Sequence, residues 1–262
     1  MQYLLYFLIA VGATTVGSLT GMGGGIIIKP VMDMLGAFDA QTIGVLSSLT
    51  VFSMSVVSIG KQMMGGIRIP FDAAIPLAVG SVAGGLAGER LLRLCVTVLQ
   101  NNQMVTVVQN GVLALLISSV IVYMRNQRRI RSFQLRGVRI SALVGLFLGL
   151  CSSFLGIGGG SVNVALVILL FPFDIKTATL CSLITIFFAQ LSKLGAVALS
   201  TGFAVFDLRA APVMIAGAIA GGFIGGGLNR RCREEAVERT FSLVQLLVLG
   251  IAIANVIKNL PR

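Results

Sequence analysis

The stretch Gly21-Met22-Gly23-Gly24-Gly25 returns 135 residues later as Gly156-Ile157-Gly158-Gly159-Gly160, and both copies interrupt long apolar runs. In a soluble protein, a glycine-rich turn between a strand and a helix suggests phosphate binding. Neither copy follows a strand pattern, so the nucleotide-loop interpretation fails its own context test. Paired breaks in apolar helices are instead typical of membrane transporters, in which they place backbone groups around a solute.

The composition predicts a membrane protein. Hydrophobic residues make up 56% of the chain and charged residues 11%, and the mean hydropathy is +0.98, outside the range of soluble globular domains. A bilayer core of about 30 Å requires about 20 apolar residues per helix. Apolar runs near that length cover residues 3–19, 42–59, 71–92, 105–123, 140–171, 177–199, 207–228 and 240–257. We predict an all-α polytopic membrane protein with eight to ten membrane segments.

The two glycine runs belong to an internal repeat. Residues 18–60 align without a gap with residues 153–195, and 13 of the 43 positions are identical. Biased composition explains only part of this identity. The chain is therefore predicted to be a duplication of two homologous halves, with a first repeat at 1–123, an arginine-rich linker at 124–138 and a second repeat at 139–262.

The number of crossings decides whether the repeats are parallel or inverted. A continuous helix over residues 3–35 would be about 50 Å long, which is long for one crossing. If the broken segment crosses the membrane once, each repeat has four crossings and the copies are parallel. If the broken segment crosses twice, each repeat has five crossings and the copies are inverted.

The distribution of basic residues favours inverted repeats. Six arginines lie together around the linker: Arg125, Arg128, Arg129, Arg131, Arg136 and Arg139. Such enrichment marks cytoplasmic loops. Parallel copies would divide the lysines and arginines at the helix ends about 10 to 7, and inverted copies about 13 to 4, with the excess on the linker side. We therefore expect a cytoplasmic linker and both termini outside. The net charge of +11 is explained by this topology, and we expect no nucleic-acid partner.

The glycine triplets are the predicted substrate site. Each triplet ends one helix and starts the next, which leaves free N–H groups and a positive helix end inside the membrane, and these favour an anion. The predicted residues are Gly23, Gly24, Gly25, Gly158, Gly159 and Gly160. The alternative is that these glycines only permit close helix packing. Two other series, spaced by four, fit that alternative better: Gly80/Gly84/Gly88 and Gly217/Gly221/Gly225.

Polar side chains near the breaks extend this prediction. Hydroxyl and amide donors suit a weakly hydrated oxyanion, although serine and threonine in helices also bond back to their own backbone. The candidates are Ser18, Ser47, Thr50, Ser153, Ser161, Asn163, Ser182, Thr185 and Gln190. Asp39 and Asp174, each followed three residues later by threonine, are predicted to be helix N-caps, as are Asp72 and Asp207.

Two lysines fall inside apolar segments, where charge is costly and therefore informative. Lys29 has Asp33 at i+4 as its predicted partner. Lys193 has no carboxylate one turn away, which makes it the better candidate for contact with an anion. The alternative for Lys193 is that its side chain extends to the membrane interface.

The repeat pattern resembles a known family. Two halves of about 130 residues, each with a G-x-G-G-G break followed by F-D-x-x-T, are similar to the TauE/SafE family of sulfite and organosulfonate exporters. The resemblance covers nearly the whole chain. It implies a protein, most often of the bacterial inner membrane, that moves small sulfur-containing anions. The residues alone support only a small anion.

The resulting prediction is a secondary transporter, an exporter, that works by alternating access around the two breaks. One alternative is a thiol-dependent sulfur relay through Cys151, and another is a membrane subunit that does not transport. The chain has no histidine and its four cysteines form no disulfide framework, so we expect no metal, no cofactor and no enzymatic activity. The identity of the anion, the direction of flux, a coupling ion and homo-oligomerisation stay open.

Overall fold

The computed structural model describes residues 2–65, 69–126, 133–135 and 137–260, and these residues form ten α-helices with no strand. The helices are α1 (Gln2–Thr20), α2 (Gly25–Leu35), α3 (Ala40–Met63), α4 (Phe71–Leu99), α5 (Asn102–Asn126), α6 (Val138–Leu155), α7 (Ser161–Leu170), α8 (Ile175–Leu199), α9 (Ala211–Arg231) and α10 (Glu234–Asn259). Seven of the fifteen linker residues, at 127–132 and 136, lie outside the described residues.

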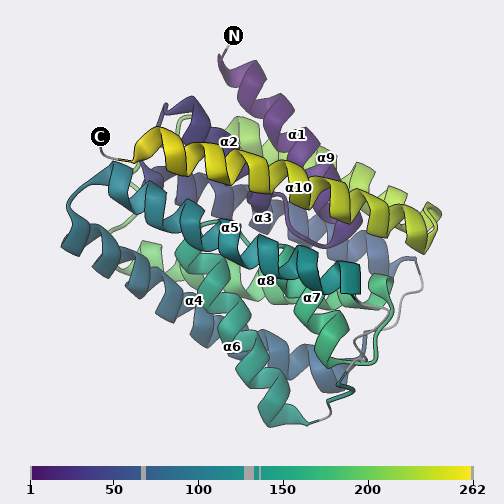
Figure 1. The fold of residues 1–262 in the computed structure, drawn as a ribbon. Helices are drawn as coiled ribbons and strands as arrows, with labels where there is room; N and C mark the ends of the chain where they lie inside the picture. Colours follow the sequence, from purple (N-terminus) through teal and green to yellow (C-terminus); the bar gives the residue numbers. More distant parts are fainter. Residues whose placement is uncertain (1, 66–68, 127–132, 136, 261–262) are drawn as a thin grey trace.

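Eight of these helices are long and apolar enough to cross a membrane, and α2 and α7 are the two short ones. The prediction of an all-α polytopic membrane protein is therefore confirmed. Figure 1 shows the helices packed in one bundle, in which α5 and α10 lie side by side along one face.

Both predicted helix breaks are present. Gly23 lies between α1 and α2 with a φ of 76°, and Gly158 lies between α6 and α7 with a φ of 63°. These left-handed backbone conformations favour glycine because a β-carbon would be strained there. Asp39 accepts hydrogen bonds from the first amides of α3, and Asp174 does the same for α8. The N-caps predicted at Asp39 and Asp174 are confirmed. Those predicted at Asp72 and Asp207 are wrong, because α4 begins at Phe71, which places Asp72 inside its first turn, and α9 begins only at Ala211.

The first five helices and the last five interlock. The most extensive contacts join α4 to α6 and α1 to α9. A β-carbon on Gly84 would lie 2.0 Å from the Leu146 carbonyl oxygen, and one on Gly225 would lie 2.1 Å from the Thr15 carbonyl oxygen. The glycines spaced by four thus permit close packing, as predicted, and each series faces a helix from the other half of the chain.

Each broken pair starts and finishes at one end of the bundle. The Tyr6 ring at the start of α1 lies 5.8 Å from the Phe38 ring, which follows α2. Lys258 at the end of α10 donates to the Met34 carbonyl oxygen at 3.0 Å. The α6–α7 pair begins directly after the linker, and the amide of Phe133 donates to the Leu169 carbonyl oxygen of α7 at 2.9 Å.

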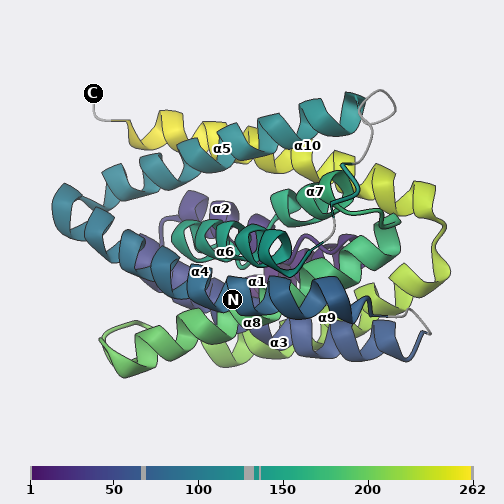
Figure 2. The ribbon, with the colours of Figure 1, turned by 90° about the horizontal axis from the view of Figure 1, so that it is seen from below.

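These two ends are opposite. In Figure 2 the end of α10 is on the left, whereas the end of α5 and the turn between α9 and α10 are on the right. The α1–α2 pair is therefore associated with the C-terminal end, and the α6–α7 pair with the linker end.

Candidate functional site

The two glycine breaks meet inside the bundle. A β-carbon on Gly23 would lie 2.9 Å from the carbonyl oxygen of Gly158. A β-carbon on Gly25 would lie 2.0 Å from the carbonyl oxygen of Ile157 and 2.6 Å from the Ser47 hydroxyl. All six glycines of the two triplets are buried. Backbone from distant parts of the sequence thus meets at distances that only glycine permits.

Two helix N-termini open at this junction, and neither has a side-chain cap. The first backbone bonds of α2 run from Ile27 and Ile28 to the Gly24 carbonyl oxygen, and Asn163 donates to the Gly160 carbonyl oxygen in α7. The amides before these bonds have no partner among the described residues: Gly25 and Ile26 in α2, and Ser161 and Val162 in α7. Such free amides at the positive end of a helix favour an anion.

Four of the predicted polar side chains are buried with an unpaired donor group. These groups are Ser47 Oγ, Ser153 Oγ, Ser161 Oγ and Asn163 Nδ2. Buried polar groups almost always have a hydrogen-bond partner, so each exception requires an explanation. Ser47 lies beside Gly25, and Ser161 and Asn163 lie in the first turn of α7, so these donors surround the uncapped helix ends in an arrangement that a small oxyanion would complete. The Ser153 side chain, near the end of α6, lies against Gly88 of α4.

The other predicted hydroxyls already have protein partners. Ser18 donates to the Gly222 carbonyl oxygen at 3.3 Å and Ser182 to that of Gly21 at 2.7 Å. Thr50 bonds back to Leu46 at 2.7 Å. Thr185 likewise bonds back to its own helix, to the Cys181 carbonyl oxygen at 2.8 Å. The structure therefore distinguishes the two members of each duplicated serine pair. Ser47 and Ser153 have no hydrogen-bond partner, whereas their counterparts Ser182 and Ser18 each donate to a carbonyl oxygen.

Gln190 and Lys193 lie on the same helix near the second break. Gln190 donates to the Ser152 hydroxyl at 2.9 Å. Lys193 Nζ donates to the carbonyl oxygens of Ser153 at 3.3 Å and Gly44 at 3.4 Å. The Lys193 side chain is only 1% exposed, so it is enclosed by the bundle and does not reach its surface.

Lys193 also has a carboxylate neighbour that the sequence analysis missed. Glu89 of α4 places an oxygen 3.9 Å from Lys193 Nζ, and the same carboxylate pairs with Arg93 at 3.2 Å. Lys193 therefore has no carboxylate one turn away on α8, as the sequence shows, but it does have one on a neighbouring helix. The i+4 search covers only the residue's own helix, whereas Glu89 comes from another helix in the first half of the chain. A cavity of about 50 Å³ is lined by Glu89, Arg93 and Lys193 among others.

Amides from neighbouring helices bind the last carbonyl groups of the two broken helices. Asn229 donates to the Leu19 carbonyl oxygen at 2.6 Å, and Gln109 donates to that of Phe154 at 2.7 Å. Leu19 and Phe154 are equivalent positions of the repeat. Sequence analysis missed both amides, and the available signal was a polar side chain within an otherwise apolar helix.

The predicted pair of Lys29 and Asp33 is confirmed, with 3.1 Å between the ammonium and a carboxylate oxygen. Asn110 of α5 donates to Asp33 at 2.9 Å, and Asn255 of α10 donates to the Pro30 carbonyl oxygen at 2.9 Å. This buried network fixes α2 against α5 and α10. Lys29 is thereby committed to a structural contact.

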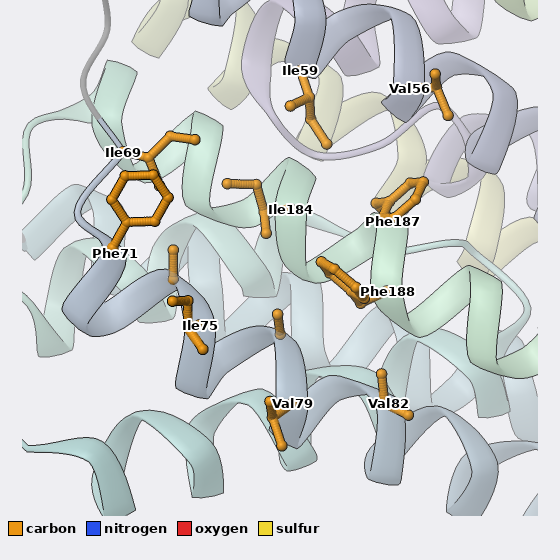
Figure 3. Close-up of a pocket in the computed structure, with 12 residues that line it drawn as sticks. Val56, Ile59, Ile69, Phe71, Ile75, Val79, Val82, Ile184, Phe187 and Phe188 are labelled. Carbon is orange, nitrogen blue, oxygen red and sulfur yellow. The ribbon is translucent and has the colours of Figure 1, made fainter.

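The hollow in Figure 3 is not suited to an anion. It lies between α3, α4 and α8, has a volume of about 510 Å³ and is lined by apolar side chains such as Ile75, Ile184 and Phe188. Among the described residues, no charged or hydrogen-bonding side chain lines it. An anion there would lose its hydration without compensation.

Residues 6–253 match the model of the family described as "Sulfite exporter TauE/SafE". The chain belongs to this family. It is also similar to the "Probable membrane transporter protein YunE" of Bacillus subtilis (strain 168), with 26% identity over 275 residues that cover 95% of this chain and 96% of the relative. No solved structure matches the chain. This TauE/SafE protein is thus an integral membrane protein of a transporter family, and its breaks lie within the matched region.

Proposed function

We propose that this TauE/SafE protein is a secondary transporter that exports a small sulfur-containing anion, such as sulfite or an organosulfonate. The proposal places the anion at the junction of the two glycine breaks. The observation that carries it is the combination of two uncapped helix N-termini with unpaired buried donors, at Ser47, Ser153, Ser161 and Asn163. The family description supports the substrate class.

The chemistry of the junction fits an oxyanion. A sulfite or sulfonate group has three oxygens, each of which accepts hydrogen bonds from amides and hydroxyls. Charge-assisted hydrogen bonds are roughly twice as strong as neutral ones, and the low dielectric inside the bundle strengthens them further. Lys193 supplies an ammonium at the end of α6, although Glu89 partly offsets its charge at 3.9 Å.

Alternating access follows from an inverted arrangement of the two halves. Inversion is supported by the broken pairs, since α1–α2 starts and finishes near Met34 and Lys258 while α6–α7 does so at the linker end. It is also supported by the matching contacts of α1 with α9 and of α4 with α6. In this mechanism the α1–α9 and α4–α6 units rock against each other, and the anion at the junction is exposed first to one end and then to the other.

The linker end faces the cytoplasm in this proposal. Basic residues at that end include Lys61, Lys176 and Arg230, in addition to the arginines around the linker. The positive-inside rule then places both termini outside. An inner-membrane exporter would load its anion at the linker end and release it at the end where α10 finishes.

A thermal-shift panel on purified protein tests the binding function. The probes are sulfite, thiosulfate, sulfoacetate, taurine and sulfate, with chloride at equal ionic strength as the control. A ligand present at 100 times its Kd stabilises the native state by about 2.7 kcal/mol, which is measurable as a rise in Tm. We expect a rise with at least one sulfur anion and none with chloride. If no probe raises Tm, the non-transporting alternative is favoured.

A further inference from the structure

A second hollow, of about 600 Å³, lies at the linker end between α3, α8 and α9. Of the residues that the structure describes, four basic side chains and no acidic one line it: Lys61, Lys176, Arg230 and Arg231. It is distinct from the glycine junction, which is buried, whereas both arginines here are exposed.

Contacts around the hollow position two of these four basic side chains, Lys61 and Arg230. Lys61 Nζ lies 5.1 Å from the centre of the Phe223 ring, a cation–π distance that directs the ammonium toward the hollow. A β-carbon on Gly65 would lie 2.9 Å from Arg230 Nε. Gly65 therefore lets the Arg230 guanidinium lie against the end of α3, where a larger residue would displace it.

None of these four basic side chains forms an ion pair with a described carboxylate. Within the part of the chain that the structure describes, none of them has a carboxylate within 4.0 Å. Asp174, which is close to Lys176 in sequence, is used to cap α8 and accepts from the Thr177 hydroxyl at 2.5 Å. By contrast, the exposed Arg209 has Asp207 at 3.7 Å.

Ordinary helix-end electrostatics does not explain the cluster. Arginine in the last turn of α9 is favoured by the helix dipole. Lys176, however, lies in the first turn of α8, where the dipole disfavours a cation. Its position at the rim of the same hollow adds like-charge repulsion, which a bound anion would relieve.

We propose that this hollow is an oxyanion-binding site separate from the glycine junction. Its ligand is a tetrahedral or trigonal oxyanion group, held by the guanidinium forks of Arg230 and Arg231 together with the ammonium groups of Lys61 and Lys176. The forked geometry of arginine suits two oxygens of such a group. Two sources carry this chemistry: a free ion in the cytoplasm, or the headgroup phosphate of an anionic lipid.

The test compares the parent with the double variant Arg230→Gln/Arg231→Gln, using Arg209→Gln/Lys258→Gln as the matched control at the opposite end. One arm measures sulfate binding by calorimetry in lipid-free detergent at low salt. The other arm measures Tm in nanodiscs of phosphatidylcholine with or without phosphatidylglycerol. Both arginines are exposed, so we expect the double variant to fold like the parent.

A free-ion ligand predicts a roughly tenfold rise in the Kd of sulfate in the double variant only. A lipid ligand predicts that phosphatidylglycerol raises the Tm of the parent and of the control but not of the double variant. If the double variant matches the control in both arms, the proposal is overturned. The sulfate titration is repeated in a Ser153→Ala/Ser161→Ala background, so that binding at the hollow is measured independently of the glycine junction.

Discussion

Lys193 Nζ donates to the carbonyl oxygen of Ser153 at 3.3 Å, at the point where the second broken helix ends. The equivalent carbonyl oxygen, that of Ser18, accepts from the neutral amide of Gln62 at 3.4 Å. The two breaks thus share a backbone arrangement, but only the second has an ammonium at this position. Under the proposed function, the second break contributes more of the charge that the anion requires.

Gly160→Ala is the cleanest single substitution in the breaks. Gly160 has an extended backbone with a φ of −178°, and its β-carbon would meet only the flexible ends of Ile157 at 3.1 Å and Ile26 at 3.6 Å. We expect normal folding but a severalfold loss of anion transport, because the methyl group lies beside the free amides of α7. Transport into proteoliposomes at equal protein content is the measurement.

Gly84→Ala is the control for that experiment. Its β-carbon would lie 2.0 Å from the Leu146 carbonyl oxygen, so α4 and α6 must separate and the yield of folded protein should fall. Parent-level transport by Gly160→Ala would show that the space beside α7 is not used by the anion.

Glu89 and Lys193 should be energetically coupled. Removing one member of a buried pair leaves the other charge uncompensated, whereas removing both does not. We therefore expect the double variant Glu89→Gln/Lys193→Gln to be more stable than the sum of the single effects predicts, by about 1 kcal/mol. Thermal unfolding of the four proteins in detergent measures this coupling. Strict additivity would indicate that the 3.9 Å contact carries no energy.

A cysteine-free variant tests the sulfur-relay alternative. The four cysteines are free thiols, and Cys181 is fully buried. Under the transport proposal they have only packing roles, so replacement by alanine or serine should leave flux of the best anion from the thermal-shift panel within about twofold of the parent after correction for folded protein. Abolished flux with an unchanged Tm would instead favour thiol chemistry.

The proposed orientation is testable by labelling in intact cells. Single cysteines are introduced into the cysteine-free variant at Lys258, at the end of α10, and at Arg233, in the turn before α10. A membrane-impermeant maleimide should label the cysteine at position 258 and leave the one at position 233 unmodified until the cells are permeabilised. The reverse pattern would place the linker end outside. Equal labelling of both would rule out a single crossing by α10.

Local chemistry in the sequence was sufficient to predict the helix breaks and two of the four expected N-caps. Gly23 and Gly158 require a left-handed backbone, and Asp39 and Asp174 have the spacing of caps. Which helices pack against each other was harder to predict from the sequence. The glycine series containing Gly84 predicts a close neighbour but cannot specify that the neighbour is α6, because that choice depends on contacts between residues far apart in the chain.

The sequence indicated which polar residues lie near the breaks, but not which of them have hydrogen-bond partners. Thr50 and Ser47 are equally duplicated, yet Thr50 bonds back to its own helix while the Ser47 hydroxyl lies beside Gly25 without a hydrogen-bond partner. The side-chain direction that separates them depends on how α3 is rotated in the bundle. Glu89 was missed as a neighbour of Lys193 for the same reason, since the contact joins two helices about a hundred residues apart in sequence.

The most direct test of the central claim is sulfite transport in proteoliposomes by the double variant Ser47→Ala/Ser161→Ala, compared with Ser58→Ala. Both hydroxyls of the double variant are buried and unpaired, whereas the equally buried Ser58 bonds back to Met54 at 2.7 Å. If the junction binds the anion, the double variant should lose at least tenfold in sulfite flux at unchanged Tm, and Ser58→Ala should transport like the parent. Equal sulfite flux by all three proteins would contradict the assignment of the glycine junction as the anion site.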